Sequence, residues 1–145
     1  MPLTVRQITL WRTEVENTVG VLARTLKPLA ETGSDLQVVM GYRYPGSANR
    51  AAIEVYPVTG RKVTAAAQGA GLSASAIPTL LIDGDNKPGL GYAIAQAIAG
   101  AGINLTFLVA QVIGRRYSAV AGFDIEADAK KAASLIKKAA AGKKK

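Results

Sequence analysis

The sequence predicts an α+β fold made of two consecutive units of the same design. Sliding the 145-residue chain along itself aligns Asn17 with Asn86 and Gly20 with Gly89 at one offset and without a gap. In each half, β-branched and aromatic runs alternate with segments of helical periodicity. The repeated order is strand, helix, strand, strand, helix. With right-handed crossovers, this order predicts two ferredoxin-like βαββαβ units, each an antiparallel sheet with helices on one face.

In the first half, runs rich in β-branched and aromatic residues predict strands, and the segments between them with helical spacing predict helices. The turn Pro45-Gly46-Ser47 separates the second strand from the third. The predicted elements are a strand over Val5–Trp11, a helix over about Thr18–Thr32, strands over Leu36–Tyr44 and Ala51–Tyr56, and a helix over about Gly60–Ala70.

In the second half, Pro88 marks a helix start, because proline is tolerated at the first helical position. Leu90, Ile94 and Ile98 recur at helical spacing, and Gly100-Ala101-Gly102 stops the helix. The predicted elements are a strand over Ile77–Asp83, a helix over Pro88–Ala101, strands over Leu105–Ile113 and Tyr117–Ile125, and a helix over Ala127–Ala141.

The repeat predicts two domains, residues 1–74 and residues 75–145. Residues 73–77 can supply a fourth strand to the first domain, whereas only Gly142 and three lysines follow the last helix. The second sheet is therefore expected to have an unfilled edge. Open sheet edges favour pairing with another chain, which predicts a homodimer or higher oligomer.

A membrane span is the first alternative to this fold. From Pro88 to Gly114 the chain carries no charged residue, and these 27 residues exceed the roughly 20 needed to cross a bilayer. However, glycines interrupt the run and Asn104 follows at once, which a lipid-exposed helix disfavours. A helix followed by a strand is the preferred interpretation, with no membrane partner. Without a signal peptide at the N-terminus, the expected location is cytoplasmic.

The net charge of +8 comes almost entirely from the C-terminus. Seven lysines and no acidic residue lie within residues 130–145, which leaves 11 basic and 10 acidic residues in the rest of the chain. A solvated helix face and tail is therefore favoured over a nucleic-acid contact. The chain has no Cys and no His. We expect no disulfide, no metal ligand, no cofactor and no catalytic residue, and the protein is not expected to be an enzyme.

The stretch DGDNKPGLGYAIAQAIAGAGINL, residues 83–105, resembles the ACT domain pattern. In that pattern a strand ends in an acidic or Asn residue, and a basic residue, Pro-Gly, a helix and Gly-Ile-Asn follow. The similarity covers the chain as two tandem copies, of which the second is clearer, and is greatest to small proteins made only of two ACT domains. The resemblance implies that an amino acid or related small effector binds at interfaces between ACT units.

The residues themselves indicate a seat for a carboxylate. Gly84 and Gly89 leave room for a ligand near the backbone, and Pro88 presets the first helical turn. The first N–H groups of the helix have no helical partner and point at the loop. Asn86 offers both a donor and an acceptor, which suits an amino acid zwitterion.

The resemblance implies that Asn86 and Gly89 contact the ligand and that Asn104 contacts the ligand of a neighbouring unit. Asp85 departs from a simple anion site, because it adds a negative charge. Simple turn chemistry at Asn86 and backbone satisfaction at Asn104 are the alternative interpretations. The predicted ligand-binding residues are Asp83, Gly84, Asp85, Asn86, Lys87, Pro88, Gly89, Leu90 and Asn104, with Asn17 and Gly20 as weaker candidates in the first copy.

The expected function is that of a non-catalytic regulatory or sensor protein, with a regulated enzyme as a further partner. A ligand-free oligomerisation module is one alternative. A nucleic-acid-binding protein that uses the basic tail is another. It is disfavoured because AAIEVY and YSAVAGFDI, the predicted third strands, lack the interleaved aromatic residues that stack bases.

Overall fold

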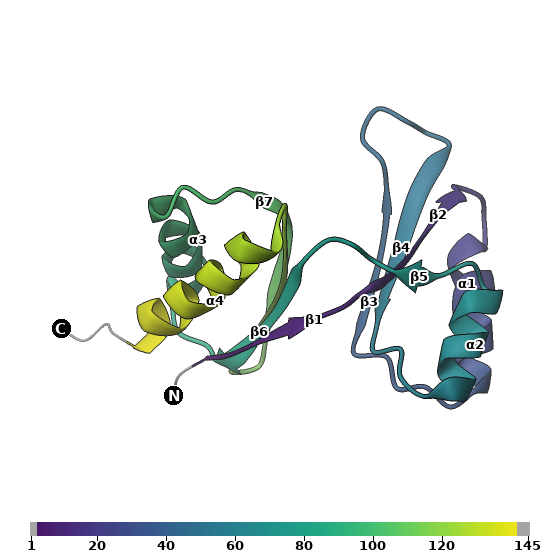
Figure 1. Ribbon diagram of the computed structural model, residues 1–145, viewed down its shortest axis with the longest axis horizontal. Coiled ribbons are helices and arrows are strands. Elements are labelled where there is room, and N and C mark those ends of the chain that lie inside the picture. The colour runs from purple at the N-terminus through teal and green to yellow at the C-terminus, as the bar shows by residue number, and fades with distance from the viewer. Residues whose placement is uncertain (1–2, 142–145) are drawn as a thin grey trace. The chain divides into compact units, whose positions relative to one another are not determined.

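The computed structural model describes residues 3–141, which form two compact units (Figure 1). The first unit comprises residues 9–76. The second unit comprises residues 77–141 together with residues 3–8. Each unit has a four-stranded antiparallel sheet and a pair of adjacent helices on one side of that sheet.

The first unit follows the predicted order of elements. Its sheet has the strand order β3-β4-β2-β5. Its elements are β2 (Trp11–Glu16), α1 (Val21–Glu31), β3 (Val38–Arg43), β4 (Arg50–Tyr56), α2 (Arg61–Gly69) and β5 (Ser73–Ala74).

The second unit repeats this order but takes its fourth strand from the N-terminal segment. Its sheet has the order β7-β8-β6-β1, the same spatial arrangement as in the first unit. Its elements are β6 (Thr79–Asp85), α3 (Leu90–Gly100), β7 (Leu105–Ile113), β8 (Arg116–Phe123), α4 (Glu126–Ala141) and β1 (Thr4–Ile8). The predicted fold class, α+β with two ferredoxin-like units, is confirmed.

The N-terminal strand differs from the prediction. The segment predicted as one strand, Val5–Trp11, is divided between β1 and β2, which lie in different sheets. Ile8 pairs with Thr79 of β6, whereas Trp11 pairs with Val55 of β4. Alternating apolar residues identify an extended segment but do not specify its pairing partner, so the division was not visible in the sequence.

The expectation that the second sheet has an unfilled edge is therefore wrong. β1 pairs antiparallel with β6 from Thr4↔Asp83 to Ile8↔Thr79 and occupies the fourth-strand position (Figure 1). The predicted domains, residues 1–74 and 75–145, divide the chain at a single point. The first compact unit, residues 9–76, is instead inserted into the sequence of the second. The segment before it supplies β1 to the second unit, and the segment after it supplies the other strands.

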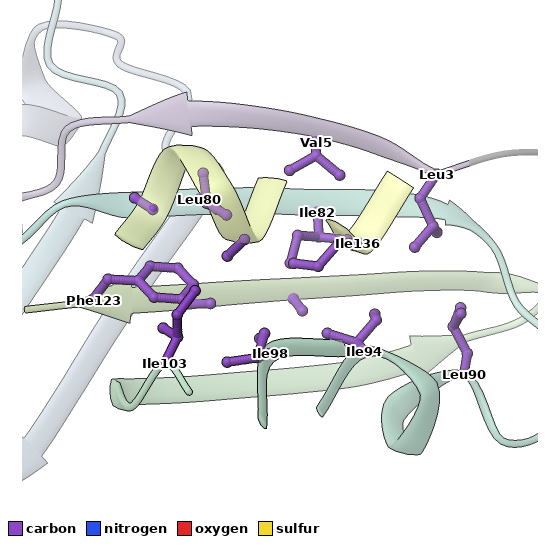
Figure 2. Close-up of a cluster of buried hydrophobic side chains, with 14 of the residues drawn as sticks. Leu3, Val5, Leu80, Ile82, Leu90, Ile94, Ile98, Ile103, Phe123 and Ile136 are labelled. Atoms are coloured by element: carbon purple, nitrogen blue, oxygen red, sulfur yellow. The ribbon is translucent and has the colours of Figure 1, made fainter. Parts of the chain in front are cut away.

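The core of the second unit shows why β1 belongs there. Figure 2 shows Leu3 and Val5 in one cluster with Leu80 and Ile82 of β6, with the isoleucines of α3 on the other side of the cluster. Leu3 and Val5 are only 6% and 8% exposed. These side chains are removed from water only when β1 is in place, so the N-terminal segment contributes to the second core.

The first unit has a separate core and a polar cluster on the opposite face of its sheet. Its core includes Leu29, Ile53 and Val55. Because successive strand residues point to opposite faces, Glu54 lies on the other face, where it is fully buried. The hydroxyl of Tyr42 donates a hydrogen bond to Glu54 Oε2 at 2.7 Å, and Arg12 Nε lies 3.7 Å from the same oxygen. Arg12 therefore compensates a buried carboxylate.

Arg12 also connects this cluster to Glu14. Arg12 Nη1 donates to Glu14 Oε2 at 3.0 Å, and Arg50 Nη2 donates to Glu14 Oε1 at 3.2 Å. The hydrogen bond from Arg12, with further ones from Tyr44 and Arg50, lowers the pKa of Glu14 to about 2. Burial by itself lowers the pKa of Arg12, but its hydrogen bonds to Glu14 and the tyrosines raise it above its ordinary value.

Leu3→Ala tests the placement of β1. The substitution removes buried atoms from the second core and should destabilise that unit by about 2–5 kcal/mol. Hydrogen–deuterium exchange should therefore accelerate at the amides of β6 and leave those of β4 unchanged. Thr4→Ala, a change at the exposed neighbouring residue, is the control and should shift stability by less than about 0.5 kcal/mol. Faster exchange in β4 instead would place β1 in the first unit.

Glu14→Gln tests the polar cluster through its pH dependence. Because the folded-state pKa of Glu14 is about 2, against an ordinary value of 4.5, ionised Glu14 stabilises the folded state above about pH 4.5. This contribution is lost as the pH falls towards 2. The melting temperature of the unsubstituted protein should thus fall more steeply between pH 5 and pH 2 than that of Glu14→Gln. Parallel curves would show that Glu14 makes no folded-state ion pair.

Candidate functional site

The loops before α1 and α3 are built alike. Asn17 N–H donates to Asn49 O, and Asn86 N–H donates to Arg115 O, each at 2.8 Å. In both units this bond joins the strand-to-helix loop to the turn between the second and third strands. The first helical hydrogen bonds also match: Arg24 N–H donates to Gly20 O and Ala93 N–H to Gly89 O, each at 3.0 Å. The sequence repeat is therefore a structural repeat.

Each of these helices begins at a glycine that other residues would not replace well. Gly20 has φ 86° and Gly89 has φ 83°, in the left-handed region. This conformation is why α1 and α3 begin at Val21 and Leu90, later than the predicted starts at Thr18 and Pro88. In the described chain no side chain caps either helix, and neither first turn holds an acidic residue. The positive end of each helix dipole therefore faces its loop.

In the second unit, the acidic residues of the predicted site are paired. Asp83, Gly84 and Asp85 lie in β6, and Gly84 is buried. Arg116 Nη1 lies 3.0 Å from Asp85 Oδ1, and its Nη2 lies 3.5 Å from Asp83 Oδ2. The sequence had marked Asp85 as unfavourable for an anion site because of its negative charge. Arg116 pairs with this negative charge. Sequence reasoning missed Arg116, although the antiparallel pairing of Asp85 with Arg116 across β6 and β8 brings the two together.

The rest of the loop combines exposed turn residues with one core anchor. Asn86 is half-buried, while Lys87, Pro88 and Gly89 are exposed. Lys87 Nζ donates to the backbone oxygen of Ala140 in the last turn of α4 at 3.4 Å. Leu90 is 3% exposed and packs in the core, so its side chain fixes the start of α3. The buried side chain of Leu90 therefore anchors the end of the loop to the core.

Asn104 lies away from this loop. It is exposed and directly precedes β7, whose Leu105 pairs with Phe123 at one end of β8. Asp85, next to Asn86, pairs with Arg116 at the other end of β8. Arg116 and Phe123 are seven residue steps apart along β8, or about 23 Å. Asn86 and Asn104 of one unit therefore cannot contact the same small ligand, and a shared site would need Asn104 from another unit.

Two hollows of the first unit lie at the loop before α1. The sequence had indicated the residues of this loop only as weaker ligand-binding candidates. One, of about 200 Å³, is lined by Asn17, by Val21 and Leu22 of α1, and by residues 41–43 of β3 and 51–53 of β4. A second, of about 260 Å³, is lined by Glu16, Asn17, Thr18 and Asn49. Asn17 therefore borders both an apolar and a polar hollow.

Arg24 adds a positive charge to the same loop. Its Nη1 donates to Val19 O at 3.2 Å, and its Nη2 donates to Thr18 Oγ1 at 3.1 Å. Sequence reasoning did not identify Arg24, although it lies one helical turn after Gly20. The weaker candidates Asn17 and Gly20 thus sit beside a cation, an uncapped helix start and a hollow.

Residues 3–141 are the whole described chain, and two kinds of feature are absent from them. In this range no group of three or more His, Cys, Asp or Glu residues is arranged to hold a metal ion. In the same range no helix has both the length and the apolar character needed to span a membrane.

Known structures share this fold. A crystal structure of a protein from Bacteroides thetaiotaomicron matches with a TM-score of 0.70 at 13% identity, over 88% of this chain and 87% of that chain. The regulatory subunits of aspartate kinase from Thermus thermophilus and Thermus flavus match with TM-scores of 0.62 and 0.60 at 16% and 17% identity, each over 96% of this chain and 97% of theirs. No protein-family model and no curated protein matches the sequence. At these identities the likeness establishes the fold.

Gly89→Ala and Gly91→Ala form a matched pair that tests the helix start. Gly89 has a positive φ, so a Cβ there should destabilise the protein by about 1–2 kcal/mol. Gly91 lies inside α3 with open space around it, so alanine there should stabilise by about 0.5–1 kcal/mol. Urea denaturation gives both values. Effects of the same sign would contradict the left-handed start of α3.

Proposed function

We propose that this chain is a tandem ACT domain protein, a non-catalytic regulatory module that binds an amino acid or a similar small effector at interfaces between ACT units. The observation that carries the proposal is the repeated loop, in which a left-handed glycine opens an uncapped helix beside an asparagine. The hollows beside Asn17 add space for a ligand in the first unit.

The loop chemistry suits a zwitterion. Val21 N–H donates to Thr18 O at 3.2 Å, and no side chain caps the rest of the first turn of α1. A ligand carboxylate at that turn gains about 0.3–1 kcal/mol from the helix dipole, and charge-assisted hydrogen bonds contribute about 1.5–3 kcal/mol. Asn17 Nδ2 donates to Ala48 O at 3.2 Å, which leaves Asn17 Oδ1 as an acceptor for an ammonium group. Glu16, which lines the polar hollow, offers a second acceptor. The ligand's aliphatic carbons then lie against Val21 and Leu22.

In the second unit, Asn86 and the first turn of α3 would bind the zwitterion in the same way. Arg116 pairs with both aspartates of β6, which lessens their repulsion of a carboxylate. Asn104 then contributes from another unit, as the ACT resemblance implies. The two loops are therefore proposed as equivalent sites with different surroundings.

The aspartate kinase neighbours support a regulatory role and a regulated enzyme as partner. Two of the matching structures are, by their own description, regulatory subunits of that enzyme. We infer that this chain likewise acts on a separate catalytic protein, as a homodimer or higher oligomer. A ligand-free interaction module is the competing function. The lysines of residues 142–145, invoked for nucleic-acid binding, lie outside the described residues.

A thermal-shift screen with each common amino acid, followed by titration calorimetry with those that stabilise, tests the proposal. An effector at a hundredfold excess over its Kd should stabilise the folded protein by about 2.7 kcal/mol. Asn17→Ala and Asn86→Ala should each weaken binding at one of two sites at least tenfold, or about 1.4 kcal/mol. Each variant should therefore titrate with half the original stoichiometry of tight sites.

The paired variants separate the outcomes. Loss of all binding in Asn86→Ala and none in Asn17→Ala would confine the site to the second unit. Unchanged binding in both, with folding confirmed by circular dichroism, would remove the loops from the mechanism. A protein that no amino acid stabilises would favour the ligand-free module.

A further inference from the structure

One buried position of the repeat carries residues of very different size in the two units. Val15 of β2 pairs with Ala51 of β4, and Gly84 of β6 pairs with Tyr117 of β8. Val15 and Gly84 are related by the same offset in sequence as the loops before α1 and α3. Ala51 of the first unit is therefore equivalent to Tyr117 of the second, and the two residues are 6% and 4% exposed.

In the first unit, the small residue borders the apolar hollow of about 200 Å³. Ala51 lines this hollow together with the first turn of α1 and residues 41–43 of β3. A Cβ at Gly41 would lie 3.8 Å from Leu22 Cδ1, which is an ordinary van der Waals contact. Two small residues of neighbouring strands, Gly41 and Ala51, therefore leave space beside Leu22.

In the second unit, the equivalent tyrosine packs in the core. Tyr117 belongs to the same buried cluster as Leu90 and Ile94 of α3 and Ile136 of α4. Its side chain therefore lies on the helix-covered face of the sheet. Its hydroxyl is buried and, within the described chain, has no hydrogen-bond partner. Burial of a hydroxyl without a partner is unfavourable, so the apolar contacts of the ring hold Tyr117 in this position.

Asn17 connects the apolar hollow to the proposed zwitterion site. It lines both the apolar hollow and the polar hollow, which Glu16, Thr18 and Asn49 also line. A zwitterion held at Asn17 and the first turn of α1 therefore has its side chain next to the apolar hollow. Exposed Arg43 also lines the apolar hollow, so a cationic side chain would meet a like charge there.

We propose that the apolar hollow binds the side chain of a branched aliphatic amino acid, and that the ring of Tyr117 occupies the equivalent space in the second unit. The inference rests on the proposed function, since it requires that each loop holds the zwitterion. The first unit then admits a large aliphatic side chain, whereas the second admits only a small one. The preference arises because the ligand's methyl groups leave water when they contact Leu22 and Ile53, which line the hollow.

Titration calorimetry with alanine, leucine and lysine on the unsubstituted protein tests this preference. Alanine should fill two sites per chain, because both units admit its methyl group. Leucine should bind at one site, at least tenfold more tightly than alanine, because its additional CH₂ and CH₃ groups are buried in the hollow. Lysine should bind more weakly than leucine, because its ammonium group meets Arg43.

The three ligands separate failure of the inference from failure of the proposed function. Leucine that binds no more tightly than alanine, or lysine that binds as tightly as leucine, would overturn the inference and leave the proposed function standing. A protein that binds no amino acid would overturn both.

Ala51→Tyr and Gly41→Val fill the hollow in two independent ways. Ala51→Tyr introduces the residue of the second unit, and Gly41→Val adds a side chain at an exposed position of β3. Each variant should weaken leucine binding at least tenfold and leave alanine binding nearly unchanged. Binding of alanine thus shows that the loop is still folded. Unchanged leucine affinity in both variants would overturn the inference.

Tyr117→Ala and Tyr117→Phe form the reciprocal pair. Tyr117→Ala opens the space in the second unit, so leucine should bind tightly at two sites per chain. Tyr117→Phe keeps the ring and should retain one tight leucine site. Circular dichroism confirms that each variant is folded. A single tight leucine site in folded Tyr117→Ala, or two such sites in Tyr117→Phe, would overturn the assignment of Tyr117.

Discussion

The pairing of β1 with β6 is the constraint on which the rest of the structure depends. It places Leu3 and Val5 in the second core and completes the second sheet with residues from the opposite end of the chain. The first unit is consequently inserted in sequence within the second, and short segments join the two at Thr9–Leu10 and Ser75–Pro78. The second unit thus completes its core only when the N-terminal strand docks, whereas the first unit holds all its strands in one continuous segment.

The same pairing determines which edges remain open. With β1 on one side of the second sheet, the uncharged β7 forms the other edge. The sheet also separates the two candidate asparagines: the loop with Asn86 meets the Arg115 turn at one end of β8, and Asn104 lies at the other. A site that uses both asparagines therefore requires more than one unit.

The candidate site consists mainly of backbone groups at the starts of α1 and α3. Charged side chains nearby change its electrostatic potential. Left-handed glycines open α1 and α3 without a side-chain cap, which directs N–H groups at the loops. Arg24 and Arg116 then set the local charge, one beside the first loop and the other against the aspartates of β6. In the proposed function, a ligand is therefore held by backbone N–H groups, and the arginines tune its electrostatic surroundings.

The sequence by itself determined the repeat, the element types and the glycine positions, because hydrophobic period and left-handed turns are local properties. It identified Leu105–Ile113 as a strand with the bounds that the structure has. Tertiary structure alone decided that Val5–Trp11 divides between two sheets, that Arg116 pairs with Asp83 and Asp85, and that hollows lie at Asn17. These features depend on which distant segments meet. An alternating strand pattern shows that a segment is extended and which face is apolar, but the choice of partner is made by burial summed over the whole core.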